Sequence, residues 1–352
     1  VPLIYGSHQQ AIMEENFKGT IEKSPNEILL SEELGRLLKP IFYTGEKSYE
    51  ESLRYFAKES RATERVLREC IECGFSALTF GGETRMISKK DIAMEINRCP
   101  QVSTGISPSY YTGFDYISKV LEHTLKEDSL HGFDQELLKT CIPLYKEIER
   151  NQTLHFIAEP SIFSYLGERQ KKYPTEITTP PNTNQPHFFH HSPDRKDVEE
   201  GVYVTVTGIP GLEHLFEDVQ KMGLRVYTHR PELIPGSLLA SPHIVADEKI
   251  KFHFARSGWG SLWLSFLTDT PFVTRPYHPH DDVEIYFNNK CIENLGIGMV
   301  FDKKSTVEDL FDYAVRYKKS SDALKEKLIA KYGTLDGVHY TAQKIVDHFV
   351  AQ

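Results

Sequence analysis

The sequence predicts an α/β protein built from two Rossmann-like, doubly wound domains. Apolar runs typical of buried strands alternate with segments in which apolar residues recur at helical spacing, and this alternation is the pattern of a parallel sheet with crossover helices. The chain of 352 residues is too long for most single compact domains. A proline-rich segment also separates two halves, each of which shows the alternating pattern.

The first predicted domain covers residues 1–172. Its strand-like runs are short and apolar, and its helical segments carry apolar residues three and four positions apart. We predict helices over residues 48–73, 116–126 and 133–150, and strands over residues 2–5, 75–80, 101–103 and 154–157. Because strands and helices alternate, the strands are expected to lie parallel.

Residues 173–197 are predicted to link the two domains. The segment carries five prolines together with Thr, Asn and His, and it has neither the period of a strand nor that of a helix. His190 and His191 lie within it, but without a set of further ligands they are more typical of solvent-facing or packed linker residues. We therefore expect no metal site here.

The second predicted domain, residues 198–334, shows the alternation most regularly. Its segments follow the order strand, helix, strand twice over: 201–207, 212–222 and 224–228, then 250–254, 259–267 and 271–274. This order predicts a doubly wound sheet. The remaining residues, 335–352, are predicted to form a helix from 337 to 350, whose apolar stripe would let it pack back on the first domain.

Composition excludes several classes of function. Lys plus Arg number 41 against 50 Asp plus Glu, a net charge of −9, so no broad cationic field exists to hold a nucleic acid or an anionic membrane. The apolar runs are shorter than the ~20 residues of a membrane-spanning helix, and no leader precedes the first strand. Five dispersed cysteines do not resemble a disulfide framework. We expect a cytoplasmic protein with reduced thiols.

The turn at residues 255–261 is the most informative candidate site. It lies between a strand and a helix, where ligands bind in open parallel sheets. Gly258 and Gly260 would let a phosphate approach the backbone N–H groups of the helix, and Ser257 or Ser261 would add a hydroxyl donor. The alternative is a tight turn with an ordinary helix cap, for which these residue types are sufficient.

The segment 253–301 that contains this turn resembles the donor-binding half of nucleotide-sugar glycosyltransferases of the GT-B fold. It looks most like the UDP-glycosyltransferase branch, which has a His-x-Gly-x-Gly/Asn-Ser turn, a strand of the form G-x-P-x-V-x-x-P and then an acidic pair. The resemblance places four residues in the diphosphate turn, namely Ser257, Gly258, Gly260 and Ser261. It also places Arg256 where the family has His, and Asp281 and Asp282 as the pair that contacts the donor sugar.

Two further segments are expected beside the same donor. Thr207 and Gly208 close the first strand of the second domain and should face the crevice, where a hydroxyl and an open backbone would meet the diphosphate. His280 lies in a loop at a strand end and is a candidate contact of the sugar. The alternatives are an ordinary strand-to-helix turn and a solvated loop histidine.

The sequence departs from the family at several positions. Leu264 stands where the family often has a Glu that holds the ribose hydroxyls, and Asp282 replaces the common Gln. Arg256 is able to bind a diphosphate but cannot serve as a base, and pairing with Asp281 or Asp282 is its structural alternative. The first domain matches only in outline. We expect its first strand, and with it the family's catalytic His, to be missing, so no base is assigned.

The resemblance implies transfer of a hexose from a nucleotide diphosphate sugar, most readily a UDP-sugar, to a hydroxyl acceptor. It implies no cofactor other than the nucleotide sugar as co-substrate, no metal, and inversion at the transferred carbon. Two alternatives remain open: a GT-B-like nucleotide-binding or auxiliary protein without activity, and a sugar-nucleotide 2-epimerase. The acceptor and the oligomeric state cannot be inferred from the residues.

Overall fold

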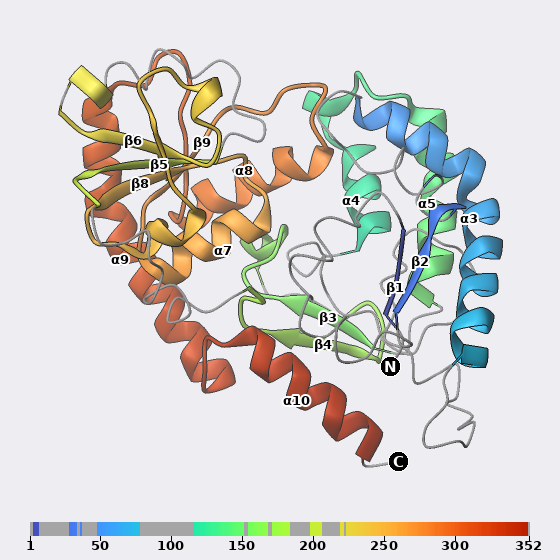
Figure 1. Ribbon diagram of the computed structural model, residues 1–352. Helices are drawn as coiled ribbons and strands as arrows, with labels where there is room; N and C mark the ends of the chain where they lie inside the picture. Colours follow the sequence, from blue (N-terminus) through green and yellow to red (C-terminus); the bar gives the residue numbers. More distant parts are fainter. Residues whose placement is uncertain are drawn as a thin grey trace. The chain divides into compact units, whose positions relative to one another are not determined.

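The computed structural model in Figure 1 describes residues 3–6, 28–33, 36, 48–77, 116–150, 154–167, 171–183, 198–205, 219–221 and 223–350. The chain forms two compact units. The first comprises Val1–Tyr111, Tyr116–Phe156 and Lys171–Ile177, and the second comprises Thr112–Asp115, Ile157–Gln170 and Thr178–Gln352. Each unit is described by itself below.

The second unit is built on a six-stranded sheet in which the paired strands run parallel (Figure 1). In spatial order its strands are β10 (Met299–Val300), β9 (Phe272–Thr274), β8 (Ile250–Phe254), β5 (Gly201–Val204), β6 (Arg225–Thr228) and β7 (Leu238–Leu239). When these six strands are numbered 1 to 6 in chain order, from β5 to β10, their spatial order read from β7 is 3-2-1-4-5-6. This is the strand order of the nucleotide-binding Rossmann fold. The predicted doubly wound sheet is confirmed.

The central strands of this sheet are buried on both faces. All residues of β5 are buried, and Val202, Tyr203 and Val204 have no exposed surface. Such continuous apolar runs are typical of parallel sheets covered by helices on both sides. Only glycine fits at position 201, because the backbone of β6 approaches closely and a Cβ atom would collide with the backbone oxygen of Arg225.

Among the described residues of the second unit, the strands are accompanied by the helices α7 (Trp259–Thr268), α8 (Val283–Leu295), α9 (Val307–Tyr332) and α10 (Gly337–Val350). Thr306 and Asp309 form a capping box at the start of α9. Helices α8 and α9 end at Gly296 and Gly333 with φ angles of 68° and 75°, which glycine adopts without steric cost. Helix α10 belongs to this unit, and the N–H of Gly337 donates to the carbonyl of Pro181 at 3.2 Å.

The first unit contains a two-stranded parallel sheet, β1 (Leu3–Gly6) and β2 (Ile28–Ser31), and the helices α3 (Tyr49–Ala77), α4 (Ile117–Thr124) and α5 (Gln135–Arg150). Helix α3 begins with a capping box of Ser48 and Glu51. Its buried Phe56 stacks on Tyr145 of α5 with ring centroids 4.3 Å apart. Packing of this apolar face therefore joins α3 to α5.

One predicted strand of the first unit is wrong where the structure describes it. Residues 75–77 continue helix α3 instead of beginning a strand. A short apolar run is ambiguous between a strand and a buried helix, and here it extends a long amphipathic helix. The rest of that predicted strand, the strand at 101–103, the pair His190–His191 and most of the helix at 212–222 lie outside the described residues.

Strands β3 (His155–Ala158) and β4 (Glu176–Thr179) form a separate two-stranded sheet. The N–H of His155 donates to Thr175 at 3.1 Å, and that of Glu159 donates to Thr179 at 2.8 Å. The observed division differs from the boundary predicted at 172, because residues 157–170 belong to the second unit and the predicted linker contains β4. The chain passes between the units within both strands.

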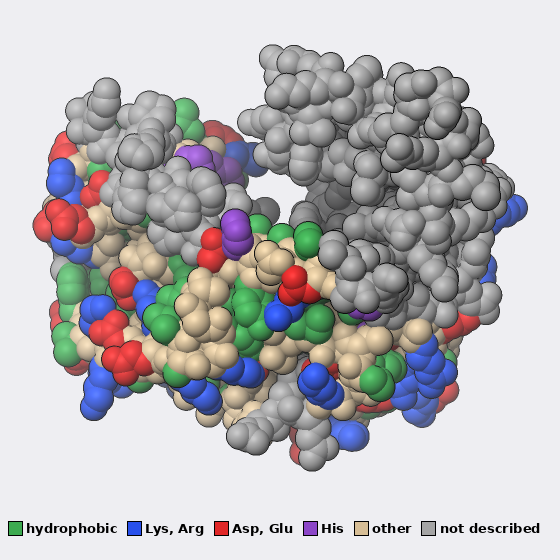
Figure 2. Space-filling model, turned by 90° about the horizontal axis from the view of Figure 1, so that it is seen from below, with side chains coloured by type: hydrophobic (Ala, Val, Ile, Leu, Met, Phe, Trp, Pro, Cys, Tyr) green, Lys and Arg blue, Asp and Glu red, His purple; other side chains and the backbone are tan. Residues whose placement is uncertain are grey.

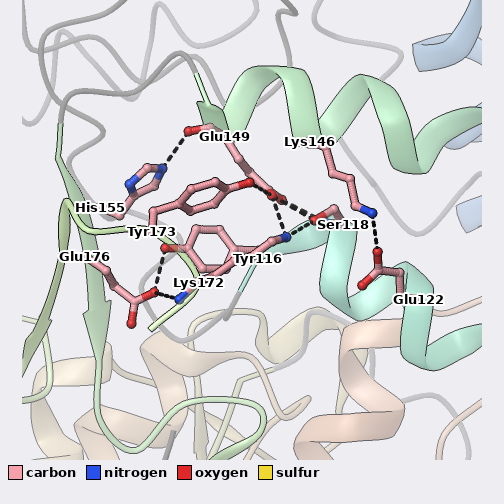
Figure 3. A network of polar contacts seen from close by, with 9 residues as sticks. All are labelled: Tyr116, Ser118, Glu122, Lys146, Glu149, His155, Lys172, Tyr173 and Glu176. Atoms are coloured by element: carbon pink, nitrogen blue, oxygen red, sulfur yellow. Dashed lines mark hydrogen bonds and ion pairs between the residues drawn. The ribbon is translucent and has the colours of Figure 1, made fainter. Parts of the chain in front are cut away.

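A buried polar network fixes the junction of α4, α5 and β3 within the first unit (Figure 3). The carboxylate of Glu149 accepts from the N–H and hydroxyl of Ser118, from Lys172 at 2.9 Å and from Tyr173 at 3.2 Å. Burial raises the pKa of the Tyr173 phenol, and the neighbouring Glu149 carboxylate raises it further. These hydrogen bonds and the ion pair offset the free-energy cost of burying the Glu149 carboxylate.

The surface carries charges of both signs. On the face seen in Figure 2, Lys and Arg side chains alternate with Asp and Glu among the described residues, and neither sign gathers into a large patch. Among all residues that the structure describes, no helix is both long and apolar enough to cross a membrane.

Candidate functional site

The topology of the second unit places the candidate site at the carboxyl ends of β5 and β8. After β5 the chain goes on to β6, and after β8 it goes on to β9, which lies toward the opposite edge of the sheet. The point between β5 and β8 is therefore the topological switch point, where ligands bind in this fold. The N–H of Thr205, directly after β5, donates to the carbonyl of Phe254 at 2.8 Å. Thr207 and Gly208, the predicted diphosphate contacts after β5, lie outside the described residues.

The β8–α7 turn, residues 255–258, leads into the N-terminus of α7. Gly258 occupies the cap position in an extended conformation and no side chain caps the helix. A Cβ atom on Gly258 or Gly260 would meet no described atom within 4 Å. The first N–H groups of a helix have no partner within the helix, so this end offers donors and the positive end of the helix dipole.

Ser257 does not present its hydroxyl group at this end. Its side chain is fully buried, and its Oγ donates to Oδ1 of Asn289 in α8 at 2.6 Å. The predicted hydroxyl contact with a diphosphate is therefore not supported for Ser257, because this group already has a partner inside the protein. Ser261 and Arg256 are each partly exposed beside the turn.

Asp281 is buried and paired with Arg275. Its two oxygens meet the guanidinium group at 2.9 Å each, and Oδ2 also accepts from the N–H of His278 at 3.0 Å. This bidentate pair fixes the loop between β9 and α8. Pairing with Asp281 is the structural alternative for Arg256, and the structure gives Arg275 as the partner of Asp281.

The other two predicted sugar contacts lie at the start of α8. Asp282 is its N-cap, and Oδ1 accepts from the N–H of Glu284 at 3.0 Å. His280 is exposed, and its ring stacks on that of His278 with centroids 5.3 Å apart. Asp282 therefore has a structural task that Asn would also perform, and His280 has the exposure of a loop residue.

Two buried asparagines of α8 that the sequence did not single out hold the β8–α7 turn. Asn288 is fully buried, and its Nδ2 donates to the carbonyl of Ser257 at 2.6 Å and to Oε1 of Glu284 at 2.9 Å. Asn289 accepts from Ser257 and donates to the carbonyl of Arg275 at 3.1 Å. The signal in the sequence is the occurrence of polar residues four positions apart on an otherwise apolar helix face.

Glu284 is a buried carboxyl group next to this turn. Its pKa is raised to about 8, chiefly by burial and also by the Asp282 carboxylate, against an opposing effect of the Arg256 guanidinium group. Glu284 is therefore mostly uncharged at pH 7. A group with such a shifted pKa beside a candidate site is a feature of functional sites and also of some structural networks.

His253 is a structural residue and not a base. It is buried in β8, and its ring nitrogens lie 2.6 Å from the Ser265 hydroxyl and 2.9 Å from the Thr205 hydroxyl. Burial lowers its pKa to about 3, so the imidazole is neutral near pH 7. Through these two hydrogen bonds it connects β8 to α7 and to Thr205, the residue directly after β5.

The apolar residues of α7 pack into the core. Trp259 and Trp263 are buried, and the Trp263 indole donates to the carbonyl of Pro160 at 3.2 Å. Leu264 packs against a cluster that includes Tyr203 and Ile244. Among the residues that the structure describes, no three His, Cys, Asp or Glu side chains are grouped as metal ligands.

Comparison with solved structures shows the fold. A crystal structure of Arabidopsis thaliana UGT89C1 complexed with UDP superposes with a TM-score of 0.50 at 12% sequence identity, covering 100% of this chain and 91% of that one. The chain has the GT-B fold. In a GT-B protein two Rossmann-like domains are present, and the sheet order of the second unit is the one that this fold requires.

Other similar structures are glycosyltransferases that match over a shorter length. The glycotransferase of kitacinnamycin gives a TM-score of 0.39 at 13% identity over 66% of this GT-B chain, and SnogD from Streptomyces nogalater gives 0.36 at 14% identity over 60%. The matches span 65% and 62% of those two chains, less than two thirds of their length. No protein-family model matches the sequence. No curated protein matches it either.

Proposed function

We propose that this GT-B protein is a glycosyltransferase that moves a hexose from a nucleotide diphosphate sugar to a hydroxyl group. The observation that carries the proposal is the N-terminus of α7, which lies at the switch point of a 3-2-1-4-5-6 sheet and is flanked by Gly258, Gly260 and Arg256. The solved similar structure of Arabidopsis UGT89C1 was obtained with UDP, and a UDP-sugar is the donor we propose.

The leaving group of the reaction is a diphosphate, whose negative charge grows as the bond to the sugar breaks. Backbone N–H groups and the dipole of α7 would stabilise that charge without rearrangement, and Arg256 would add charge-assisted hydrogen bonds. Ser261 lies in the first turn of the helix and would donate through its hydroxyl group. These residues supply the stabilisation that a metal supplies in other transferases, so we propose metal-independent transfer.

The acceptor hydroxyl group must lose a proton during transfer, and the base is proposed to come from the first unit. Inversion at the sugar carbon would follow from direct attack on the donor. His253, a buried imidazole of β8, is excluded as this base because both of its nitrogens have partners and its pKa is low. We further propose a cytoplasmic location, in keeping with the charge of the chain.

A binding experiment tests the donor site directly. UDP, GDP, dTDP and their sugar conjugates are added to the full chain in thermal-shift and calorimetric titrations, because a ligand of the folded state raises its stability by about 2.7 kcal/mol at 100 times Kd. Saturable binding of one nucleotide family is expected. Arg256→Ala and Ser261→Ala should each weaken it about tenfold or more, since each removes a hydrogen bond to a charged group.

Arg316→Ala is the matched control, because Arg316 is an exposed residue of α9 away from the turn. It should leave the nucleotide affinity unchanged. Unchanged affinity in both turn variants would move the donor site elsewhere, and failure of every nucleotide to bind would leave a GT-B protein of another function.

A nucleotide-binding protein without transferase activity is the second candidate. Two observations favour it. Asp281 forms an ion pair with Arg275. Leu264, at the position where the family commonly has a Glu that binds the ribose, packs against the hydrophobic core. The two functions separate in a mixture of sugar nucleotides and hydroxyl compounds. Nucleotide binding with neither transfer nor hydrolysis of the donor would select the second candidate.

A further inference from the structure

Glu284 is the one buried acidic side chain in contact with the residues that hold the β8–α7 turn in the part of the chain described. Its carboxyl oxygen accepts from Asn288, and the same amide nitrogen donates to the carbonyl of Ser257 in the turn. The Arg256 guanidinium group acts on it electrostatically from the turn itself. The group therefore lies directly behind the end of α7 that would receive an anion.

We propose that Glu284 is a positioning residue that sets how strongly the β8–α7 turn attracts a diphosphate. Uncharged, Glu284 adds no negative charge beside the turn. Ionised, it places a negative charge behind the site and opposes the binding of a diphosphate. This inference rests on the proposed nucleotide-sugar donor site and extends it to a dependence on pH.

The raised pKa of Glu284 puts this change of state within reach of an experiment. The pKa of Glu284 is raised to about 8, chiefly by burial and also by the Asp282 carboxylate, while Arg256 and the amide of Asn288 act in the opposite direction. Because the ordinary value is near 4.5, the folded state holds this proton more tightly than the unfolded chain between those pH values. The stability of the protein therefore falls as the pH rises toward 8 and levels off above it.

The other charged groups around Glu284 are accounted for by the structure. Asp282 precedes it on α8 and caps the helix, and Arg256 faces it from the β8–α7 turn. In the loop before α8, Asp281 is paired with Arg275. His278 and His280 lie in that same loop and are exposed. Phosphate groups and imidazoles ordinarily change charge at about pH 6 to 7, and they are the same in the native protein and in Glu284→Gln, so the difference between the two proteins isolates Glu284.

The test measures the Kd of UDP and dTDP for the full chain from pH 7 to pH 9.5, in the native protein and in Glu284→Gln. Gln keeps an oxygen that accepts from Asn288 but cannot ionise. We expect the native Kd to rise about tenfold over this range, the effect of one added charge near the ligand at an intermediate dielectric, whereas the Kd of Glu284→Gln stays constant with pH. The comparison uses the slope of log Kd against pH, whatever the absolute affinities.

A second measurement does not depend on the size of the Kd. Because the coupling between ligand and proton is reciprocal, a diphosphate that prefers uncharged Glu284 must raise its proton affinity. Calorimetry at pH 8 in two buffers of different ionisation enthalpy should show proton uptake on binding in the native protein and less uptake in Glu284→Gln. Glu293→Gln is the control on the same helix, at an exposed position, and should retain the native slope and the native uptake.

The outcomes separate the inference from the function on which it rests. Nucleotide binding with equal pH slopes in the native protein and in Glu284→Gln would overturn the inference and leave the donor site intact. Absence of nucleotide binding at every pH would overturn both. Without ligand, the loss of thermal stability between pH 7 and pH 8.5 should be smaller in Glu284→Gln, and equal losses in the two proteins would also overturn the inference.

Discussion

Three carboxylates near the start of α8 perform three different tasks. Asp281 pairs with Arg275, Asp282 caps the helix, and Glu284 is buried against Asn288. Their side chains differ little, but their surroundings do: a guanidinium group stabilises one charge, a helix N-terminus stabilises the second, and burial disfavours the third. Which carboxylate touches a ligand cannot be decided from residue type, and this is why the sequence treated Asp281 and Asp282 alike.

Asp281→Asn should destabilise the second unit. The substitution leaves the Arg275 guanidinium group, which is largely buried, without its charged partner. Removing one partner of a buried pair costs about 3 to 5 kcal/mol. Urea unfolding of the two proteins at pH 7 measures the loss. The matched variant is Asp282→Asn, which keeps a helix cap and should cost well under 1 kcal/mol. Equal losses in both variants would mean that the pair with Arg275 has no special weight.

At the level of elements, α8 holds the β8–α7 turn, on which the proposed donor site is built. Asn288 binds the backbone of Ser257 and Asn289 binds its side chain, so two successive residues of α8 fix one residue of the β8–α7 turn. Both asparagines are buried, and each hydrogen bond is short. The conformation of the turn is therefore determined by contacts with a helix that follows it in sequence.

Asn289→Ala should lower the free energy of unfolding by about 1 to 3 kcal/mol, because it leaves the buried hydroxyl group of Ser257 without this partner. It should also weaken UDP binding by loosening the turn. Asn294→Ala on the same helix removes only an exposed side-chain bond to Lys290 and serves as the control. Denaturant titration and calorimetry measure the two effects. A loss of stability without any change in UDP affinity would show that the Asn289–Ser257 hydrogen bond supports the fold and not nucleotide binding.

The sequence predicted the elements around the site better than the orientation of its side chains. Strand β8 and the first residue of α7 lie where their apolar pattern placed them, because strand, glycine turn and helix start are all local signals. The inward rotation of Ser257 and the capture of Asp281 by Arg275 depend on partners that come from other segments. Local patterns carry no information on such partners.

At the level of the whole molecule, each compact unit has its own buried residues. Phe56 and Tyr145 pack in the first, and the strands β5 and β8 form the center of the second. Units with separate cores ordinarily unfold as separate cooperative transitions. UDP, if it binds at the α7 N-terminus, should raise the midpoint of one transition and leave the other in place.

Differential scanning calorimetry of two variants tests this assignment. Glu149→Gln weakens the ion pair with Lys172 in the first unit, and Asp281→Asn breaks a pair in the second. Each substitution should lower the midpoint of a different transition by several degrees. Loss of 1 kcal/mol or more is expected from each. A single transition that both variants shift equally would show that the chain unfolds as one cooperative unit.

The crossing of the chain within β3 and β4 bears on how the protein may be divided for experiment. The second unit cannot be excised as one continuous fragment that starts at Val198, because residues 157–170 and 178–197 also belong to it. Pro160 accepts from the Trp263 indole, Ser161 accepts from the Cys291 thiol at 3.2 Å, and Glu159 binds Lys331 at 2.7 Å. A fragment lacking these residues would expose buried donors to water, so expression of the second unit requires them to be retained, for example by beginning the fragment at Ile157.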